Sequence, residues 1–459
     1  MTSSPRRSVA VAALCCGTLA VQFDSAVNIA FPDLIRYFAI PIPQIQWIVI
    51  SYTLTYAALM LVFGRVGDIF GHRTIFLAGA VVSAIAFVLC GVSTQYGWLL
   101  AARVLQGIGA AGLLSCGPAL ITSLYGEERR AQVLSLYTLL IGIGGALGPI
   151  VGGFLVQRWG WPAVYLFRAP IALLALAAGL ALPAGARRTL RECFDGLGAV
   201  LLVLAIAALL LALNQLQARG QWLASLMLFG ATAFLSVAFT RRELRVAHPI
   251  IDVGYFRNGD FALLNAGQTL LSIAGFTIFL LAPFYLDTIG HLSAPAGGLV
   301  LAASPAGLIL GAPVAARLAS VIHPRRMALT GAVSSAIGLL TISLLGEQLN
   351  LVVLVIACAM QGFGMGLFQV AYFDIATATL PKENRGVAGS LVLMTRTVGI
   401  VMGASVLTLV FRALSEGAGT TSPSLTAGFS GTFAFAGCVS LLVVVLALSR
   451  GWAGTERPH

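Results

Sequence analysis

Fourteen apolar segments, each about long enough to cross a bilayer as a helix of roughly 20 residues, dominate this sequence. With boundaries good to a few residues they are 8–31, 47–67, 75–93, 97–123, 132–156, 163–183, 197–217, 221–240, 261–286, 295–318, 327–345, 350–373, 387–412 and 428–449. Only 9% of the residues are charged, whereas a soluble domain carries about 25%. We therefore predict an all-α polytopic membrane protein with fourteen transmembrane helices.

Lysine and arginine are spread unevenly over the connections between these segments. If the N-terminus is cytoplasmic, 20 of the 27 basic residues face the cytoplasm and 4 face the opposite side, while Arg103, Arg168 and Arg396 fall inside helices. Because basic residues resist translocation, both termini are predicted to be cytoplasmic and the protein to lie in the cell (inner) membrane. The net charge of +11 then reflects this bias and does not predict nucleic-acid binding.

An internal repeat is visible at an offset of 255 residues. Gln106 and Gly107 in the fourth segment match Gln361 and Gly362 in the twelfth, and further identities follow at the same offset through the next segment. The repeat predicts two six-helix halves, 8–183 and 261–449, with residues 197–240 as an inserted helix pair. Parallel halves of this kind are typical of transporters whose substrate site lies between the halves near the midplane.

Four motifs occur in order along the first half. The first segment reads DSAVNIAFP from Asp24, the connection after the second segment reads GRVGDIFGHR from Gly64, the fourth segment reads RVLQGIGAA from Arg103, and the fifth reads GGALGPIVGG from Gly144. Together they resemble the signatures of the major facilitator superfamily, in its 14-helix drug:proton antiporter branch. The resemblance covers essentially the whole chain.

The resemblance implies a proton-coupled antiporter that exports amphipathic drugs or related small molecules by alternating access, as in multidrug efflux and antibiotic resistance. It also implies a conformational switch in the connection after the second segment and in the glycine-rich fifth segment. The residues concerned are Gly64, Asp68, Gly71, Arg73, Gly144, Gly148, Pro149 and Gly152. Gly144, Gly148 and Gly152 share one helix face, where plain close packing is the alternative to a bendable contact between the halves.

Asp24 and Arg103 are the predicted proton-coupling pair. A charged residue inside an apolar helix costs about 3 kcal/mol or more unless it faces water or a partner. At 1.5 Å per residue, Arg103 lies about 7 to 8 Å below the outer edge and Asp24 about 24 Å above the inner edge, so both fall in the outer half of the membrane. Competition between a proton and a cationic substrate for Asp24 would produce antiport.

Further polar residues are expected to line a substrate cavity. They are Asn28, Gln106, Arg168, Gln361, Gln369, Tyr372, Asp374 and Arg396. Arg168 stands where the antiporter branch usually has Asn, which predicts an altered choice of substrate. Two alternatives stay open: the glutamines of the twelfth segment could serve interhelical hydrogen bonding, and Asp374 could be a residue of the membrane interface with Arg396 as its partner.

Two other classes of protein fit less well. A facilitator-fold proton symporter that imports a polar metabolite is the main alternative, and the glycine-rich fifth segment and the helix count argue against it. A membrane enzyme has little support, because none of the five histidines is paired with an acid at catalytic or metal-binding spacing. No G-x-x-x-x-G-K-[ST] motif supports an ATP-driven pump. We expect no metal or cofactor, a monomer in the lipid bilayer, and small molecules and protons as partners.

Overall fold

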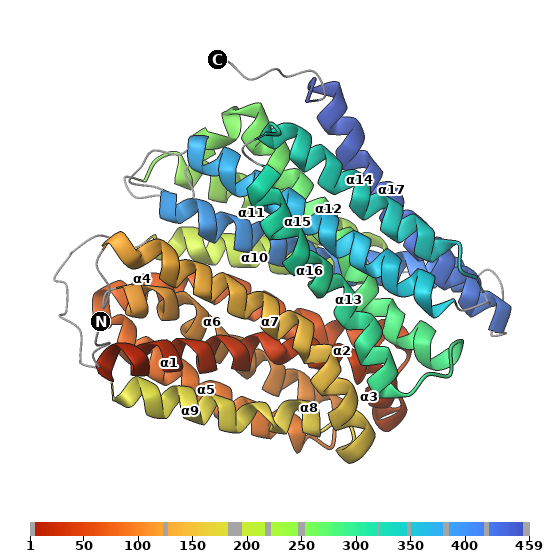
Figure 1. Cartoon of the computed structure of the whole chain (residues 1–459), viewed down its shortest axis with the longest axis horizontal. Coiled ribbons are helices and arrows are strands. Elements are labelled where there is room, and N and C mark those ends of the chain that lie inside the picture. The colour runs from red at the N-terminus through yellow and green to blue at the C-terminus, as the bar shows by residue number, and fades with distance from the viewer. Residues whose placement is uncertain are drawn as a thin grey trace. The chain divides into compact units, whose positions relative to one another are not determined.

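The computed structural model describes residues 5–122, 127–181, 195–215, 222–246, 253–318, 321–346, 350–379, 385–416 and 422–452, and every regular element in these ranges is a helix (Figure 1). In chain order the elements are α1 (Pro5–Gln22), η1 (Phe23–Ser25), α2 (Ala26–Ile29), α3 (Phe31–Phe38), η2 (Ile42–Ile45), α4 (Gln46–Phe70), α5 (His72–Gly91), α6 (Tyr96–Thr122), α7 (Glu127–Trp159), α8 (Ala163–Leu166), α9 (Arg168–Leu180), α10 (Gly196–Gln215), α11 (Trp222–Glu243), η3 (Val253–Arg257), α12 (Gly259–Thr288), α13 (Ala294–Leu318), α14 (Pro324–Ser343), α15 (Leu351–Thr379), α16 (Arg385–Glu416) and α17 (Ser422–Ser449).

The helices agree with the apolar segments of the sequence. Each predicted segment falls on one of them, except that the first and the sixth are each divided between consecutive helices. Among the described residues twelve stretches are long and apolar enough to cross a membrane. This establishes a multi-pass, all-α membrane protein. The helices α7 and α10 are not among the twelve stretches, so the count of fourteen crossings stays a prediction.

The first segment is not the continuous helix that the sequence predicts. A 3-10 turn, η1, separates α1 from α2, and a second interruption at Ala30 precedes α3, which has Pro32 in its first turn. The Ser25 hydroxyl donates hydrogen bonds to the carbonyl oxygens of Gln22 (3.2 Å) and Gly144 (3.3 Å), so a side chain competes with regular helix bonding at the break. Short 3-10 stretches inside a helix often mark functional hinges.

The chain divides into two compact units, one formed by Met1–Leu209 with Leu226–Ile251 and the other by Leu210–Ser225 with Asp252–His459. In the first unit α6 packs against α4 and α5, and α1 packs against α6, α7 and α9 (Figure 1). In the second unit α15 packs against α13 and α14, and α12 packs against α16 and α17.

Glycines matched by the repeat serve equivalent close contacts within their own units. A Cβ atom on Gly107 of α6 would lie 2.7 Å from the Tyr52 carbonyl oxygen of α4, and one on Gly362 of α15 would collide with the Ser304 carbonyl of α13. Small residues at such crossings let helix backbones approach closely. The predicted boundaries of the two halves and of the insert remain a proposal.

The helices α10 and α11 are joined by an ion pair between their ends. Arg242, in the last turn of α11, donates from Nε to both carboxylate oxygens of Asp195 (2.6 and 2.9 Å). Asp195 directly precedes α10 and also accepts from the Gly198 backbone N–H (3.0 Å). Because the start of one helix meets the end of the other, the two run antiparallel, as expected for a pair that crosses the membrane twice.

This pairing generates a topology prediction. A reporter enzyme that is active only outside the cytoplasm should be active when fused at Gly220, between the two helices, and inactive at Arg188 or Arg245, which flank the pair. Activity at Arg188, or inactivity at Gly220, would show that α10 and α11 do not both cross. Fusions at Gln157 provide the matched external control.

Candidate functional site

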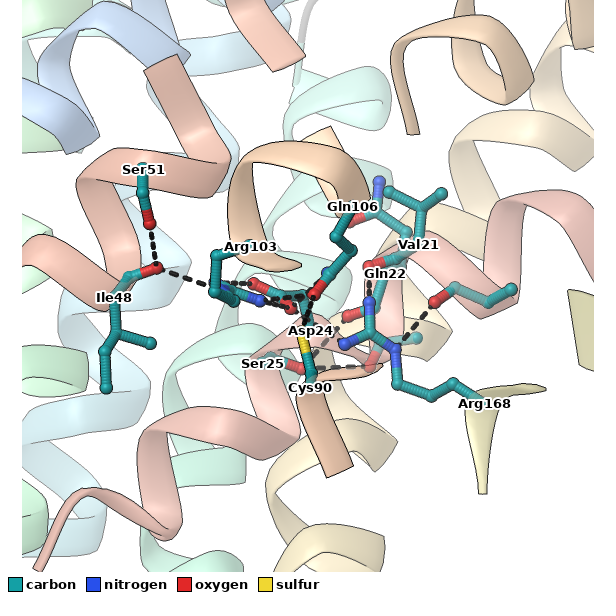
Figure 2. Close-up of polar contacts among 12 residues, drawn as sticks. Val21, Gln22, Asp24, Ser25, Ile48, Ser51, Cys90, Arg103, Gln106 and Arg168 are labelled. Atoms are coloured by element: carbon teal, nitrogen blue, oxygen red, sulfur yellow. Dashed lines mark hydrogen bonds and ion pairs between the residues drawn. The ribbon is translucent and has the colours of Figure 1, made fainter. Parts of the chain in front are cut away.

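The broken first helix places Asp24 among polar side chains of two other helices, α6 and α9. Its carboxylate is the one acidic group paired with Arg103 and Arg168 in the part of the chain that the structure describes. Figure 2 shows Asp24 between the two guanidinium groups. We name Asp24, Arg103, Gln106 and Arg168 the Asp24 cluster.

Arg103 of α6 makes the most extensive contact with Asp24. It donates from Nη1 to Oδ1 (2.5 Å) and from Nη2 to Oδ2 (3.0 Å), while its Nε donates to the Ile48 carbonyl of α4 (2.8 Å). Gln106, one helical turn further along α6, donates from Nε2 to Asp24 Oδ1 (2.9 Å) and accepts from Arg103 Nη1 (2.9 Å). Asp24 and Arg103 are therefore in contact, as their similar depth in the membrane predicted.

Arg168, the first residue of α9, binds the same carboxylate from another side. Its Nη1 donates to Asp24 Oδ1 (2.8 Å), its Nε to the Ala20 carbonyl (2.9 Å) and its Nη2 to the Val21 carbonyl (3.3 Å). The last two bonds use carbonyl groups at the C-terminal end of α1, which the 3-10 turn leaves free of regular helix partners. The break in the helix therefore supplies acceptors for a buried cation.

Aromatic side chains enclose both guanidinium groups. Arg103 Cζ lies 4.4 Å from the centre of the Tyr52 ring and 5.9 Å from that of Tyr165, and Arg168 Cζ lies 4.2 Å from that of Phe87. The side chains of Arg103 and Arg168 are 1% and 0% exposed, whereas Asp24 retains 19%. Cation–π contacts of this kind are worth about 2 kcal/mol or more when desolvated.

The Asp24 cluster contains one contact that the sequence interpretation did not include. Asp24 was expected to bind a proton or a cationic substrate in competition, with Arg168 as a separate residue of the cavity wall. Arg168 binds Asp24 directly, so the cluster carries two positive charges and one negative charge, and the predicted contact of Arg168 with substrate is untested. A cation that approached Asp24 would meet two guanidinium groups in a low-dielectric environment, where like charges repel strongly.

The position of Arg168 could have been obtained from the sequence by the argument applied to Arg103. Arg103 lies five residues after Trp98, and Arg168 lies five residues after Ala163, where the sixth segment begins. Both are therefore about 7.5 Å into helices that enter from the same side. The carbonyl acceptors at Ala20 and Val21 could not be found this way, because they depend on the break.

The glycine stripe of α7 lies against the same break. A Cβ atom on Gly144 would lie 2.5 Å from Gln22 Cβ, one on Gly148 would collide with the Ser25 hydroxyl, and one on Gly152 would lie 2.7 Å from the Ala26 carbonyl oxygen. The nearest neighbours of the stripe are therefore residues of α1, η1 and α2 in its own unit, and its predicted role as a bendable contact between the halves is untested. The buried Pro149 lies beside the stripe, and Asn28 in α2 is half-buried.

The connection between α4 and α5 is a single residue. Gly71 adopts φ +95°, a backbone conformation that favours glycine. Arg73 donates to the carbonyl oxygens of Gly179 (3.2 Å) and Leu180 (2.8 Å), so it caps the C-terminal end of α9. A Cβ atom on Gly64 would meet no neighbour within 4 Å. The Asp68 side chain lies outside the described part of the chain, and its predicted switch role is untested.

In the second unit the predicted cavity residues separate into two groups. Gln361 is buried and accepts from the Ser304 hydroxyl (2.7 Å), and the buried Tyr372 hydroxyl donates to the Asn265 side chain. For these two the structure shows interhelical hydrogen bonding, and their predicted role in a substrate cavity is untested. Gln369 and Arg396 are half-buried and Asp374 is exposed, and their predicted contact with substrate is untested.

Comparison with known proteins identifies the family. The family model described as Major Facilitator Superfamily matches residues 13–241 and 264–458. The chain belongs to the major facilitator superfamily. It is therefore a membrane transporter and not an enzyme.

Relatives within the superfamily differ in what their names say they act on. The riboflavin transporter RibZ of Clostridioides difficile is 27% identical over 401 residues, which cover 87% of this chain and 87% of that protein. The methylenomycin A resistance protein of Bacillus subtilis is 28% identical over 469 residues, which cover 99% of this chain and 98% of that protein. A crystal structure of a peptide transporter, POT, in complex with sulfate has a TM-score of 0.73 at 14% identity and covers 97% of this chain and 94% of its own. That likeness establishes a shared fold.

The close approach of α7 to the helix break generates a stability prediction. In Gly152→Ala the new methyl group would lie within 2.9 Å of three Ala26 atoms, and overpacking of this kind costs about 1 to 3 kcal/mol. The unfolding temperature of the purified protein should therefore fall. Gly97→Ala, at a helical glycine with nothing within 4 Å, should leave it unchanged, and equal behaviour of the two variants would refute the packing account.

Proposed function

We propose that this protein is a proton-coupled secondary active transporter that exports amphipathic small molecules by alternating access. It acts in the cell membrane, with both termini cytoplasmic and fourteen crossings, and works as a monomer. Asp24 is the group that binds the proton. Resistance proteins among its relatives support export as the direction of transport.

The observation that carries this proposal is the Asp24 cluster. A carboxylate inside a spanning segment is costly unless it is paired, and such residues commonly mark proton or substrate pathways. Asp24 accepts four hydrogen bonds from Arg103, Gln106 and Arg168, and all four depend on its negative charge or its acceptor oxygens. It is also the most exposed member of the cluster, which gives a proton access to it.

Protonation of Asp24 couples the cluster to conformation. A protonated carboxyl group no longer compensates the two guanidinium groups, and breaking a buried ion pair costs about 3 to 5 kcal/mol. A second conformation, in which the arginines contact water or other acceptors, is then favoured. The proton acts here as the ligand, and a ligand shifts a conformational equilibrium by the difference in its affinity for the two states. The 3-10 turn and the glycine stripe of α7 provide the place where α1 and α2 move.

Co-transport of a polar metabolite with protons is the second candidate. It is favoured by the relative named a riboflavin transporter. Vesicles separate the two candidates once a resistance and accumulation screen in an efflux-deficient host has supplied a substrate. An exporter accumulates that substrate in inverted vesicles with an acidic interior, and a proton-coupled importer accumulates it in right-side-out vesicles in acidic medium.

Substitutions in the Asp24 cluster test the proton-binding role. Asp24→Asn keeps the shape of the side chain but removes the titrating group, so proton-driven export should fall on the order of tenfold or more. Arg103→Ala should have a similar effect. The double variant should be no worse than either single variant, because the two residues act as one unit.

A matched control is available in the same part of the chain. Asp33 forms an exposed ion pair with Arg36 at 3.0 Å, and exposed pairs contribute little to stability. Asp33→Asn should therefore export at close to the wild-type rate. If Asp24→Asn also did so, with an unchanged pH dependence, the proton-binding carboxylate would lie elsewhere, and Asp374 would be the next residue to test.

A further inference from the structure

The Asp24 cluster holds a net positive charge away from water. Arg103 and Arg168 are both buried, and within the described ranges Asp24 is the single carboxylate that pairs with them. The remaining acceptors are neutral: the carbonyl groups of Ile48, Ala20 and Val21 and the amide of Gln106. Neutral oxygens solvate a cation but do not cancel its charge, so one positive charge is left uncompensated.

Donor capacity is also left over in the cluster. A guanidinium group has five N–H donors, and Arg168 uses three of them: one to Asp24 and two to backbone carbonyls. One N–H on each Nη atom thus has no acceptor among the described residues. The hydroxyl group of Tyr165, whose ring lies beside Arg103, is buried and likewise has no hydrogen-bond partner among them.

Asp24 is where a ligand can reach this donor capacity. Its side chain is the exposed part of the ion-paired group, and Oδ1 is shared by three donors, from Arg103, Gln106 and Arg168, whereas Oδ2 binds one. A ligand carboxylate can replace Asp24 Oδ1 as the acceptor for Arg168, while Arg103 keeps its two hydrogen bonds to Asp24. The net charge of the cluster with its ligand then falls from +1 to 0.

We propose that Arg168 binds an anionic oxygen of the substrate, so that this transporter carries amphipathic acids in preference to amphipathic cations. The inference rests on the proposed function in taking the Asp24 cluster as part of the substrate site. Arginine suits this task because its planar fork matches a carboxylate, and charge-assisted hydrogen bonds are about twice as strong as neutral ones. A cation would add a like charge to two buried guanidinium groups.

A matched series of naphthalene compounds tests the proposal. 1-Naphthylacetate, 1-naphthylacetamide and 2-(1-naphthyl)ethylammonium share one ring system and differ in charge. Binding to the purified full-length protein at neutral pH is measured by isothermal titration calorimetry. The wild-type protein should bind the acid at least about tenfold more tightly than the amide, and the ammonium compound more weakly than the amide.

Variants then assign the preference to Arg168. Arg168→Asn should bind the acid and the amide equally, whereas Arg168→Lys, which keeps the charge, should retain part of the preference. Arg36→Asn, at an exposed arginine outside the cluster, should behave as the wild type. If Arg168→Asn does not fold, the wild-type series and Arg168→Lys still decide the question.

The opposite results overturn the proposal. Equal binding of acid and amide by the wild type, tighter binding of the ammonium compound, or binding of none of the three would each show that the cluster does not select acids. A preference that survives in Arg168→Asn would place the anion site elsewhere. Because binding needs no proton gradient, loss of proton-driven export and loss of acid preference are separate results, so failure of the proposed function is distinguishable from failure of this inference.

Discussion

Charge compensation inside the membrane is the constraint on which the first unit depends. The two buried guanidinium groups of α6 and α9 are tolerable only because one carboxylate and a set of backbone carbonyls converge on them from α1, η1 and α4. Each of these elements must therefore keep its position relative to the others. The break at Phe23–Ser25 belongs to the same arrangement, because a continuous helix would occupy the carbonyl groups that Arg168 uses.

Close helix packing makes the arrangement compatible with movement. The stripe of glycines on α7 faces the break and contributes no side chain of its own to the contact. A helix that is interrupted by a 3-10 turn and packs against a glycine-lined helix face can change its direction with few side-chain rearrangements. The charge on Asp24 and the geometry of the break are thus linked. A change in the charge alters the contacts that stabilise the break, and a change in the break alters the contacts that stabilise the charge.

The sequence predicted the all-helical membrane fold, because segment length, low charge and the distribution of arginine follow directly from the physics of a bilayer. It also predicted that Asp24 and Arg103 meet, since both depths follow from the rise of a helix. It did not predict that Arg168 joins them, although equal depth of Arg103 and Arg168 was available as a signal. The helix break and the burial of Gln361 and Tyr372 depend on tertiary contacts, with Ser25, Gly144, Ser304 and Asn265, that no local pattern contains.

The central claim is that Asp24 takes up a proton during the transport cycle. Infrared difference spectroscopy of the lipid-reconstituted protein during acidification measures this directly, since a protonated carboxyl group has a C=O stretching band that a carboxylate lacks. The account predicts such a band in the wild type and in Asp33→Asn, over the pH range in which transport is active, and loss of the Asp24 contribution to that band in Asp24→Asn. An unchanged band in Asp24→Asn, or no band in the wild type, would contradict it.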